Sequence, residues 1–418
     1  MKAKDLSSVY RVFDPEKPLK GRELKEFYVE RESPIMKIKN EILNSPEKPL
    51  KILFTGARGN GKTTELNRLV EDEEFKKKIE AVFFSVKDEL DVVDVKHPDI
   101  ILLIGAKIYE IYKYCENNKV KLRKSNKVKL LKSIKEEMDN FSKRVVERVV
   151  EKIKSAELGT GFSAILKLVS KFKNESVTRE ISRQVVEPRL SELISLINKM
   201  IFLVEEELKK KIVVIIDDLD KLEAETAENL FFNHALTLTA PQCHIIYTFP
   251  VSISFSKKIS QIKRYFDDDR RLPNICLRDK KGKEIKGNYR LLRKMVKRRM
   301  EEDLITKAAL NLAIEKCGGV IHDFIRLIRL TASDVDEEGR KKIEKRDVEA
   351  LFLRMVNDYE RIVDEEDIEV LRKVKEKKEK TDGDIFRRLL FALAVLEYVD
   401  SDGRLWYDLH PAVEEIVK

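Results

Sequence analysis

Hydrophobic residues gather in short runs that are separated by longer, highly charged stretches. Two runs, Ile212–Ile216 and His244–Thr248, are almost wholly apolar, which is typical of strands buried on both faces of a sheet. Three further strands are predicted at Lys51–Thr55, Ala81–Val86 and Pro273–Leu277. Because helical patterns lie between these runs, the chain is predicted to form an α/β fold with a parallel sheet.

Apolar residues three or four positions apart predict the helices of this fold. In the first part of the chain these helices are Pro34–Leu43, Lys62–Val70, Asp99–Tyr114 and Glu223–Leu238. We therefore expect the α/β core in residues 51–116 and 209–287, with residues 1–50 as a segment that packs on it.

Residues 117–208 interrupt the core with two apolar stripes on long charged helices. The first stripe runs from Leu131 to Ile153, and the second from Ile181 to Leu208. The pattern favours an inserted helical hairpin that projects from the core as a partner-binding or oligomerisation arm. Two helices packed on the core fit the same stripes, and both arrangements stay open.

Two helical modules are predicted near the C-terminus. The helices of the first, a small lid in residues 288–362, are Tyr289–Met300, Leu304–Cys317, the helix after Gly318–Gly319, and Arg346–Val356. In the second, residues 363–418, the helix Ile385–Leu396 precedes two short strands, Tyr398–Val399 and Leu405–Tyr407. Helices followed by a hairpin predict a winged helix.

Composition limits the compartment and the partners. The 418 residues carry a net charge of +9 from 84 basic and 75 acidic side chains, which permits contact with nucleic acid without requiring it. The four cysteines lack C-x-x-C spacing, which argues against a zinc site or disulfide framework and favours the reducing cytoplasm. The N-terminus is charged where a signal peptide needs an apolar core. No apolar run approaches about 20 residues, so no membrane span is expected.

The stretch Lys51–Thr64 (KILFTGARGNGKTT) contains the most specific motif. It fits G-x-x-x-x-G-K-[ST] between a predicted strand and a predicted helix. Glycines there let backbone N–H groups hold phosphate oxygens, and the helix N-terminus adds partial positive charge. The phosphate-binding residues are expected to be Gly56, Ala57, Arg58, Gly59, Asn60, Gly61, Lys62, Thr63 and Thr64. Lys62 is expected to reach the terminal phosphates of ATP, and the Thr63 hydroxyl to bind Mg²⁺.

Acidic residues directly follow the apolar run Ile212–Ile216. A carboxylate at the end of a strand near the P-loop strand can hold Mg²⁺, and Asp217 is the predicted ligand. Asp218 is predicted to orient or activate the attacking water. Thr248 ends the next buried strand, where its hydroxyl can sense the γ-phosphate or position water.

The order of P-loop, Asp-Asp strand, Thr-tipped strand, arginine pair, Gly-Gly helix and winged helix resembles that of AAA+-type P-loop ATPases. The resemblance is to the STAND and KAP-like branch in particular, with the origin-recognition ATPases as cousins. It covers about Leu50–Ser333 by motif, and the GARGNGKTT and IDDLD runs are specific to the superfamily. It implies a parallel sheet in the order 5-1-4-3-2, with ATP and Mg²⁺ bound between sheet and lid.

The resemblance also implies roles for residues outside the P-loop. Thr248 occupies the first sensor position. Arg270 or Arg271, ahead of the predicted fifth strand, stands where an arginine finger reaches the nucleotide of a neighbouring subunit, although a solvated arginine pair fits equally. In the second sensor helix, His322 stands near the usual arginine position and Arg326 one turn later. This departure leaves the second sensor open, and His322 also fits an ordinary helix residue.

In many P-loop ATPases the segment ahead of the first strand packs near the adenine. Phe27, Tyr28 and Val29 are therefore candidates for a wall against the base, with Tyr28 as the predicted contact. A surface wrap on the core is the alternative for these residues.

These residues predict an ATP-binding and ATP-hydrolysing switch or assembly ATPase that acts through self-association or a partner protein. Because Asp218 stands where many hydrolytic relatives carry Glu, turnover is expected to be slow or to need a neighbour. STAND-like ATPases are frequent in signalling and prokaryotic defence, so the resemblance implies such a role. A nucleotide-gated scaffold that hardly hydrolyses ATP is a further possibility.

The alternative of a different class is an ATP-controlled DNA-binding regulator or replication-initiator-like protein. Its DNA contacts are expected in the winged helix. The candidate side chains are Arg387, Arg388, Arg404, Trp406 and His410.

Overall fold

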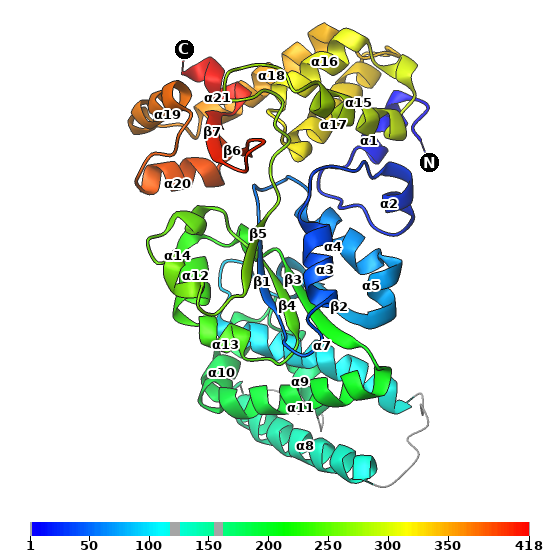
Figure 1. The fold of residues 1–418 in the computed structure, drawn as a ribbon, viewed down its shortest axis with the longest axis vertical. Coiled ribbons are helices and arrows are strands. Elements are labelled where there is room, and N and C mark those ends of the chain that lie inside the picture. The colour runs from blue at the N-terminus through cyan, green and yellow to red at the C-terminus, as the bar shows by residue number, and fades with distance from the viewer. Residues whose placement is uncertain (1, 118–125, 154–161, 418) are drawn as a thin grey trace. The chain divides into compact units, whose positions relative to one another are not determined.

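A computed structural model describes residues 2–117, 126–153 and 162–417 of the chain (Figure 1). The chain divides into two compact units. The sheet unit consists of Lys37–Phe54 and Asp72–Arg270, and the P-loop unit of Met1–Met36, Thr55–Glu71 and Arg271–Lys418. Each unit is therefore assembled from segments that lie far apart in the sequence.

Five strands in the order β2-β3-β4-β1-β5 form the centre of the sheet unit. Their bounds are β1 (Lys51–Thr55), β2 (Ile79–Ser85), β3 (Lys211–Asp217), β4 (His244–Phe249) and β5 (Asp268–Arg271). Strands β2, β3 and β4 are parallel, and β4 is buried over its whole length, as its continuous apolar run predicts. The predicted order 5-1-4-3-2 is confirmed.

The fifth strand does not lie where the sequence predicts it. β5 covers Asp268–Arg271, and Pro273–Leu277 lies outside it. Pro273 has no N–H to donate to a neighbouring strand. The backbone N–H of Asp267, by contrast, donates to the carbonyl of Lys51 over 2.9 Å. The prediction was wrong because β5 is an edge strand of four charged residues and therefore lacks an apolar run.

Helices lie before, between and after these strands along the chain. They are α3 (Ile35–Leu43), α5 (Glu73–Lys78), α6 (Val86–Glu89), α7 (His97–Asn117), α8 (Asn126–Ile153), α9 (Phe162–Val169), α10 (Ser176–Val186), α11 (Leu190–Leu208), α12 (Ala224–Glu228), α13 (Ala235–Thr239) and α14 (Ile259–Ile262). A π-helical turn at Asn229–Asn233 joins α12 to α13, within the single helix predicted at Glu223–Leu238.

Residues 117–208, for which the sequence predicts two helices, contain four in their described part, α8 to α11. The second stripe is divided between α10 and α11 at Glu187–Arg189, where Pro188 interrupts helical hydrogen bonding. Helix α11 packs against α7 and β3, and buried residues of α8 and α9 belong to the same core. This is the arrangement in which the helices pack on the core. The side chain of Leu131 lies outside the described residues.

The P-loop unit contains the helices predicted for the lid. Its helices are α1 (Leu6–Val12), α2 (Arg22–Phe27), α4 (Lys62–Glu71), α15 (Lys286–Arg299), α16 (Lys307–Lys316), α17 (Ile321–Glu337), α18 (Lys345–Glu360), α19 (Glu365–Lys377), α20 (Asp384–Phe391) and α21 (Pro411–Ile416). Helix α1 packs against α17, and apolar residues of α15 to α18 form one core with those of α1. Among all helices that the structure describes, none combines the length and apolar composition needed to cross a membrane.

Gly318 and Gly319 separate α16 from α17, as the sequence predicts. Both have positive φ angles, of 56° and 78°. A β-carbon on Gly319 would lie 1.8 Å from the carbonyl oxygen of Ile275. Only glycine can therefore occupy this position, and the start of α17 is held close to the segment before α15.

The C-terminal residues form an antiparallel pair, β6 (Val395–Val399) and β7 (Leu405–Leu409), after α19 and α20. This is the order of elements predicted for a winged helix. Helix α20 ends at Phe391 rather than at the predicted Leu396. It ends early because Leu393 has a left-handed φ of 60° and Val395 begins β6.

Candidate functional site

The loop between β1 and α4 has a curled backbone. Gly56, Gly59 and Gly61 have positive φ angles of 154°, 76° and 92°. The last of these turns leads directly into α4, which begins at Lys62. The loop therefore has the shape that a cradle of backbone N–H groups requires, at the N-terminus of a ten-residue helix.

Lys62 folds back onto this loop. Its Nζ donates to the carbonyl oxygens of Gly56 and Ala57, each over 2.9 Å, and the residue is only 6% exposed. Arg58, at the outer part of the loop, is exposed. A buried ammonium group at a loop of backbone N–H groups has the chemistry to bind phosphate.

The two threonines that follow lie in the first turn of α4. Thr63 is half-buried. The Oγ1 atom of Thr64 accepts a hydrogen bond from the backbone N–H of Leu19 over 3.1 Å. The side-chain amide of Asn67 donates to the carbonyl of Leu19 over 3.0 Å. Thr64 therefore anchors the N-terminal segment to α4.

His322 lies against the P-loop. Its backbone N–H donates to the carbonyl of Gly59 over 2.9 Å. A β-carbon on Gly59 would lie 2.5 Å from the β-carbon of His322. The first turn of α17 is therefore packed directly on the loop, at the position of this glycine.

Carboxylates surround the His322 ring. Its Nδ1 lies 3.1 Å from Oδ1 of Asp323, and its Nε2 lies 3.0 Å from Oε1 of Glu16. The hydrogen bond to Asp323, helped by Glu16 and opposed by burial, raises the pKa of His322. With a carboxylate at each nitrogen, the ring is favoured as an imidazolium, which places a positive charge beside the P-loop.

Asp323 also faces a second histidine. Nε2 of the buried His410 lies 3.3 Å from Oδ2 of Asp323, and Nδ1 of His410 accepts from the N–H of Ala412. Burial opposes ionisation of Asp323, but hydrogen bonds from His322 and His410 hold its pKa well below the usual range. One carboxylate thus links α17, at the P-loop, to the segment that begins α21.

Sequence reasoning missed Arg31. Its Nη1 donates to the carbonyl of Asn60 over 2.7 Å, and its Nη2 donates to the carbonyl of Pro273. The side-chain amide of Asn60 in turn donates to the carbonyl of Leu272 over 2.7 Å. Asn60 is thus held from two sides in the middle of the P-loop. These three contacts join residues that are separated by 29, 212 and 242 positions along the chain, and no motif in the sequence indicates them.

Tyr28, predicted to contact the base, is engaged with α4. Its hydroxyl donates to the buried carboxylate of Glu65 over 2.9 Å and accepts from Arg68 over 2.8 Å. The guanidinium of Arg68 also lies over the Tyr28 ring. Phe27 and Val29, the other members of the predicted wall, are buried. The segment therefore wraps on the unit, and only the Tyr28 side chain of the three is partly exposed.

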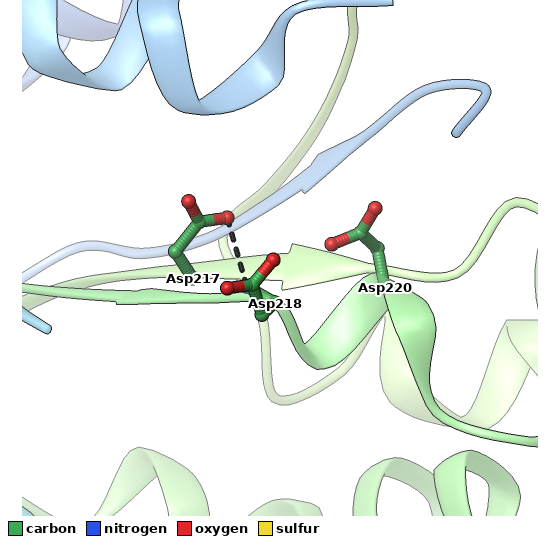
Figure 2. Close-up of side chains that lie close together, drawn as sticks. All are labelled: Asp217, Asp218 and Asp220. Carbon is green, nitrogen blue, oxygen red and sulfur yellow. Dashed lines mark hydrogen bonds between the residues drawn. The ribbon is translucent and has the colours of Figure 1, made fainter. Parts of the chain in front are cut away.

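Three carboxylates gather at the end of β3 in the sheet unit (Figure 2). One oxygen from each of Asp217, Asp218 and Asp220 lies within 4.8 Å of the others. The backbone N–H of Asp218 donates to Oδ1 of Asp217 over 2.8 Å, the dashed line in Figure 2. Clustered carboxylate oxygens are the ligands that Mg²⁺ prefers. The prediction named Asp217 and Asp218 but not Asp220, which stands in the same acidic run.

Asp218 has partners from two elements. Its Oδ1 lies 2.6 Å from Nζ of Lys221, and its Oδ2 accepts from the hydroxyl of Ser85 at the end of β2. Burial acts to raise the pKa of Asp218, but hydrogen bonds from Lys221 and Ser85 outweigh it and hold the pKa below its usual value. Asp218 also has a left-handed φ of 67°, a strained conformation that is common at functional sites.

Thr248 lies beside this cluster. Its Oγ1 accepts from the backbone N–H of Leu219 over 3.0 Å and donates to the carbonyl of Ile216 over 3.3 Å. The side chain is fully buried. The structure therefore brings Thr248 together with the acidic end of β3, because β3 and β4 are parallel neighbours.

Arg270 and Arg271 both belong to β5, not to a loop ahead of it. In the sheet unit, Arg270 is paired with Glu41 and Asp268. In the P-loop unit, Nη1 of Arg271 lies 2.9 Å from Oε1 of Glu397, a buried residue of β6. Both guanidinium groups are thus engaged within the chain.

The candidate DNA contacts of the C-terminal module are mostly engaged as well. Arg387 lies 2.6 Å from Asp384, and Arg388 lies 2.5 Å from the buried Asp367. The last two candidates are core residues: Trp406 stacks on Tyr398, and His410 is fully buried. Arg404 remains as an exposed cation of the hairpin.

Three proteins are among the solved structures to which this chain is similar. The RuvB Holliday junction branch migration motor of Thermotoga maritima is 13% identical with a TM-score of 0.38, covering 96% of this chain and 98% of that one. Cdc6p from Pyrobaculum aerophilum is 12% identical with a TM-score of 0.40, covering 97% and 95%. Drosophila ORC, in a structure bound to DNA, is 10% identical with a TM-score of 0.40, covering 99% and 91%. Likeness at this level does not inform the function of this chain.

No curated protein matches the chain. The model of the KAP family P-loop domain, in contrast, matches residues 32–249, slightly more than half of the chain. The matched part contains the glycine-rich loop, the acidic end of β3 and Thr248. This match confirms the KAP-like resemblance, and the chain belongs to the KAP family of P-loop NTPases.

Proposed function

We propose that this protein is an ATP-binding and ATP-hydrolysing molecular switch that acts through self-association or on a partner protein. The observation that carries the proposal is the position of Lys62, whose buried ammonium group contacts the carbonyls of Gly56 and Ala57. A cation held at a curled, glycine-rich loop can bind the β- and γ-phosphates of ATP. Membership of the KAP family supports a nucleotide as the ligand.

The carboxylates at the end of β3 offer oxygen ligands of the kind that Mg²⁺ prefers. The Thr63 hydroxyl and the Asp217 carboxylate are proposed to hold the ion, because both offer the oxygen ligands that it prefers. When bound, Mg²⁺ neutralises phosphate charge and orients the phosphates for displacement. Tyr28 and His322 are proposed to contact the nucleotide from the N-terminal segment and from α17.

Asp218 is the proposed base for the attacking water. Its lowered pKa keeps the carboxylate ionised at neutral pH, so it can accept a proton. The hydrogen bonds from Lys221 and Ser85 that lower the pKa also make it a weaker base. Slow turnover is therefore part of the proposal. Thr248, hydrogen-bonded to the turn after β3, is proposed to sense the γ-phosphate.

A conformational change that follows nucleotide binding is proposed to pass through α17, because the backbone N–H of His322 is hydrogen-bonded to the P-loop at Gly59. A trans role for Arg270 or Arg271 would require a neighbouring subunit to replace their present carboxylate partners. If either acts in trans, turnover per subunit should rise with protein concentration, and a flat profile would exclude that role. The family resemblance supports signalling or prokaryotic defence, and the four free, buried cysteines support a cytoplasmic setting.

Calorimetric titration with ATP and Mg²⁺ tests the nucleotide site. Lys62→Ala should weaken binding about 100-fold, because charged hydrogen bonds contribute about 1.5–3 kcal/mol each. Lys373→Ala is the matched control, since this lysine lies on α19 and its Nζ lies 2.6 Å from Oε1 of Glu369 on the same helix. Equal affinity of Lys62→Ala and the control would refute the proposal.

Phosphate release then tests hydrolysis. Asp218→Asn should abolish turnover while ATP still binds, because the amide cannot accept the proton. Tight ATP binding by the wild type without turnover at any protein concentration would instead identify a nucleotide-gated scaffold.

A further inference from the structure

Helix α15 of the P-loop unit is strongly basic (labelled in Figure 1). Its sequence, KGNYRLLRKMVKRR, contains seven basic residues and no acidic one. Of its apolar residues, Tyr289, Leu292, Met295 and Val296 are buried in the core of the unit, and Leu291 is partly buried against it. The helix is therefore anchored along one side, and its basic residues are distributed over the remainder.

Three of the seven basic residues are used to hold the helix in place. Arg293 donates to the side chain of Asn311 over 2.9 Å. Arg298 and Arg299 donate to the backbone carbonyls of Tyr28 and Phe27 in the N-terminal segment. Three of the seven basic side chains therefore have a structural role.

The other four form what we call the basic face: Lys286, Arg290, Lys294 and Lys297. All four are exposed. They stand at steps of four, four and three positions, so they lie on one side of the helix. The face extends over about 16 Å, since eleven positions at about 1.5 Å each separate its ends.

Three of the four side chains of this face form no ion pair within the described part of the chain. Lys297 lies 2.7 Å from Glu302. Within the part of the chain that the structure describes, no ion pair is recorded for Lys286, Arg290 or Lys294. Elsewhere in the same unit, exposed lysines are paired along their own helices, as Lys345 is with Glu349. Like charges four positions apart destabilise a helix slightly. Three cations without ion pairs at this spacing therefore lower the stability of the helix and do not contribute to folding.

We propose that the basic face binds duplex DNA through its phosphate backbone. Each strand of B-DNA presents a phosphate about every 3.4 Å along the axis, or about five over the length of the face. The loop before α15 adds the exposed Lys281 and Lys283, with an exposed Glu284 between Lys283 and Lys286. The four side chains of the face are all cations, so we expect binding that depends on charge and not on base sequence.

Charge and side-chain type favour duplex DNA over other polyanions. A helix that binds a membrane surface presents large apolar side chains beside its cations, whereas those of α15 are buried or partly buried in the core of the unit. Binding of single strands depends on exposed aromatic rings for stacking, and the one aromatic residue of α15, Tyr289, is buried. Recognition of duplex RNA uses contacts to 2′-hydroxyls. A row of cations does not form such contacts selectively.

Fluorescence anisotropy with a labelled duplex of random sequence tests the proposal on the full chain over a series of salt concentrations. The test variant is Lys286→Gln, Arg290→Gln and Lys294→Gln together. The control, Arg372→Gln, Lys373→Gln and Lys377→Gln on α19, removes the same charge from a helix of mixed sign. Glutamine keeps helix propensity, and the six positions are exposed, so both variants should fold.

The wild type and the control should bind with affinity that falls steeply with salt. The test variant should bind at least about tenfold more weakly, with a salt slope shallower by about 2.7, or about 0.9 for each lost contact. Equal slopes for the test variant and the control would overturn the proposal. Tighter binding of the wild type to duplex RNA, to single-stranded DNA or to phosphatidylserine vesicles than to duplex DNA would also overturn it. The result does not depend on ATP hydrolysis, so it stands or fails separately from the proposed function.

Discussion

The glycine-rich loop and the acidic end of β3 supply the two parts of the proposed chemistry, but the chain supports them differently. The loop is held by distant residues: Arg31 contacts Asn60, and the backbone of His322 contacts Gly59. The acidic end is held by its neighbouring strand and turn: Thr248 on β4 accepts from the N–H of Leu219, and Lys221, three positions after Asp218, pairs with that carboxylate. Loop shape is therefore a tertiary property, whereas the position of the carboxylates follows from strand pairing.

This difference can be tested, because substitutions at the contacts between the loop and distant residues should damage the loop and spare the acidic end. The largest effect is expected for Gly59→Ala, whose β-carbon would meet His322. We expect ATP affinity to fall about 100-fold and the free energy of unfolding to drop by about 2–4 kcal/mol. Gly339→Ala is the control, since Gly339 has a similar φ of 74° and open space around it. Calorimetry measures the ATP affinity, and thermal unfolding measures the stability. Equal losses of affinity and stability in the two variants would show that His322 does not crowd the loop.

Arg31→Ala should have the next largest effect. Removing the guanidinium leaves the carbonyls of Asn60 and Pro273 without these donors, at about 1–3 kcal/mol for a buried group. We expect ATP affinity to fall about tenfold, because the loop loses one of its two supports. Arg31→Lys should restore little, since an ammonium group lacks the fork that reaches both carbonyls. Unchanged affinity in Arg31→Ala would mean that the loop keeps its shape without this contact.

The pH dependence of stability should reveal the charge on His322. Its pKa is raised in the folded protein by Asp323 and Glu16, so its stabilisation is fully present below the unfolded pKa of about 6.5 and is lost as pH rises through the folded pKa. The stability difference between wild type and His322→Gln should therefore shrink from pH 6 to pH 9. Glu16→Gln removes one of the two carboxylates beside His322, so it should narrow the pH range over which this stability difference shrinks. A difference that stays constant with pH would exclude an imidazolium at this position.

The smallest effect is expected at the acidic end. Ser85→Ala removes one donor to Asp218 and so raises the pKa of that carboxylate. The acid limb of the turnover profile should move to higher pH, with a change of only a few-fold at neutral pH and unchanged ATP affinity. Ser85→Thr keeps the hydroxyl and should restore the wild-type profile. Loss of ATP affinity in Ser85→Ala would contradict the separation between the two regions.

The same contrast explains what the sequence could reveal. Strand β3 and its acidic run are visible because a strand buried on both faces needs a continuous apolar sequence, and the glycines of the P-loop are visible because the loop needs their backbone freedom. Asp220 stands in the same run, yet only the turn after β3 brings its carboxylate close to Asp217.

Contacts between remote segments leave no such pattern. Arg31 reaches Pro273 across 242 positions, and a single arginine in an irregular segment gives no indication of it. The engagement of Arg271 with Glu397 is hidden for the same reason. The predicted position of β5 was wrong for a different reason, because an edge strand needs no apolar run.

The composition of β5 has a consequence for behaviour in concentrated solution. An open strand at the edge of a sheet offers unpaired backbone groups to any other extended chain and so invites aggregation. In β5 all four residues, Asp268–Arg271, are charged. Such a strand resists pairing with an apolar extended chain, because that contact would desolvate its charged side chains. The charges that hide β5 in the sequence therefore also protect this edge of the sheet from pairing with exposed apolar segments of other chains.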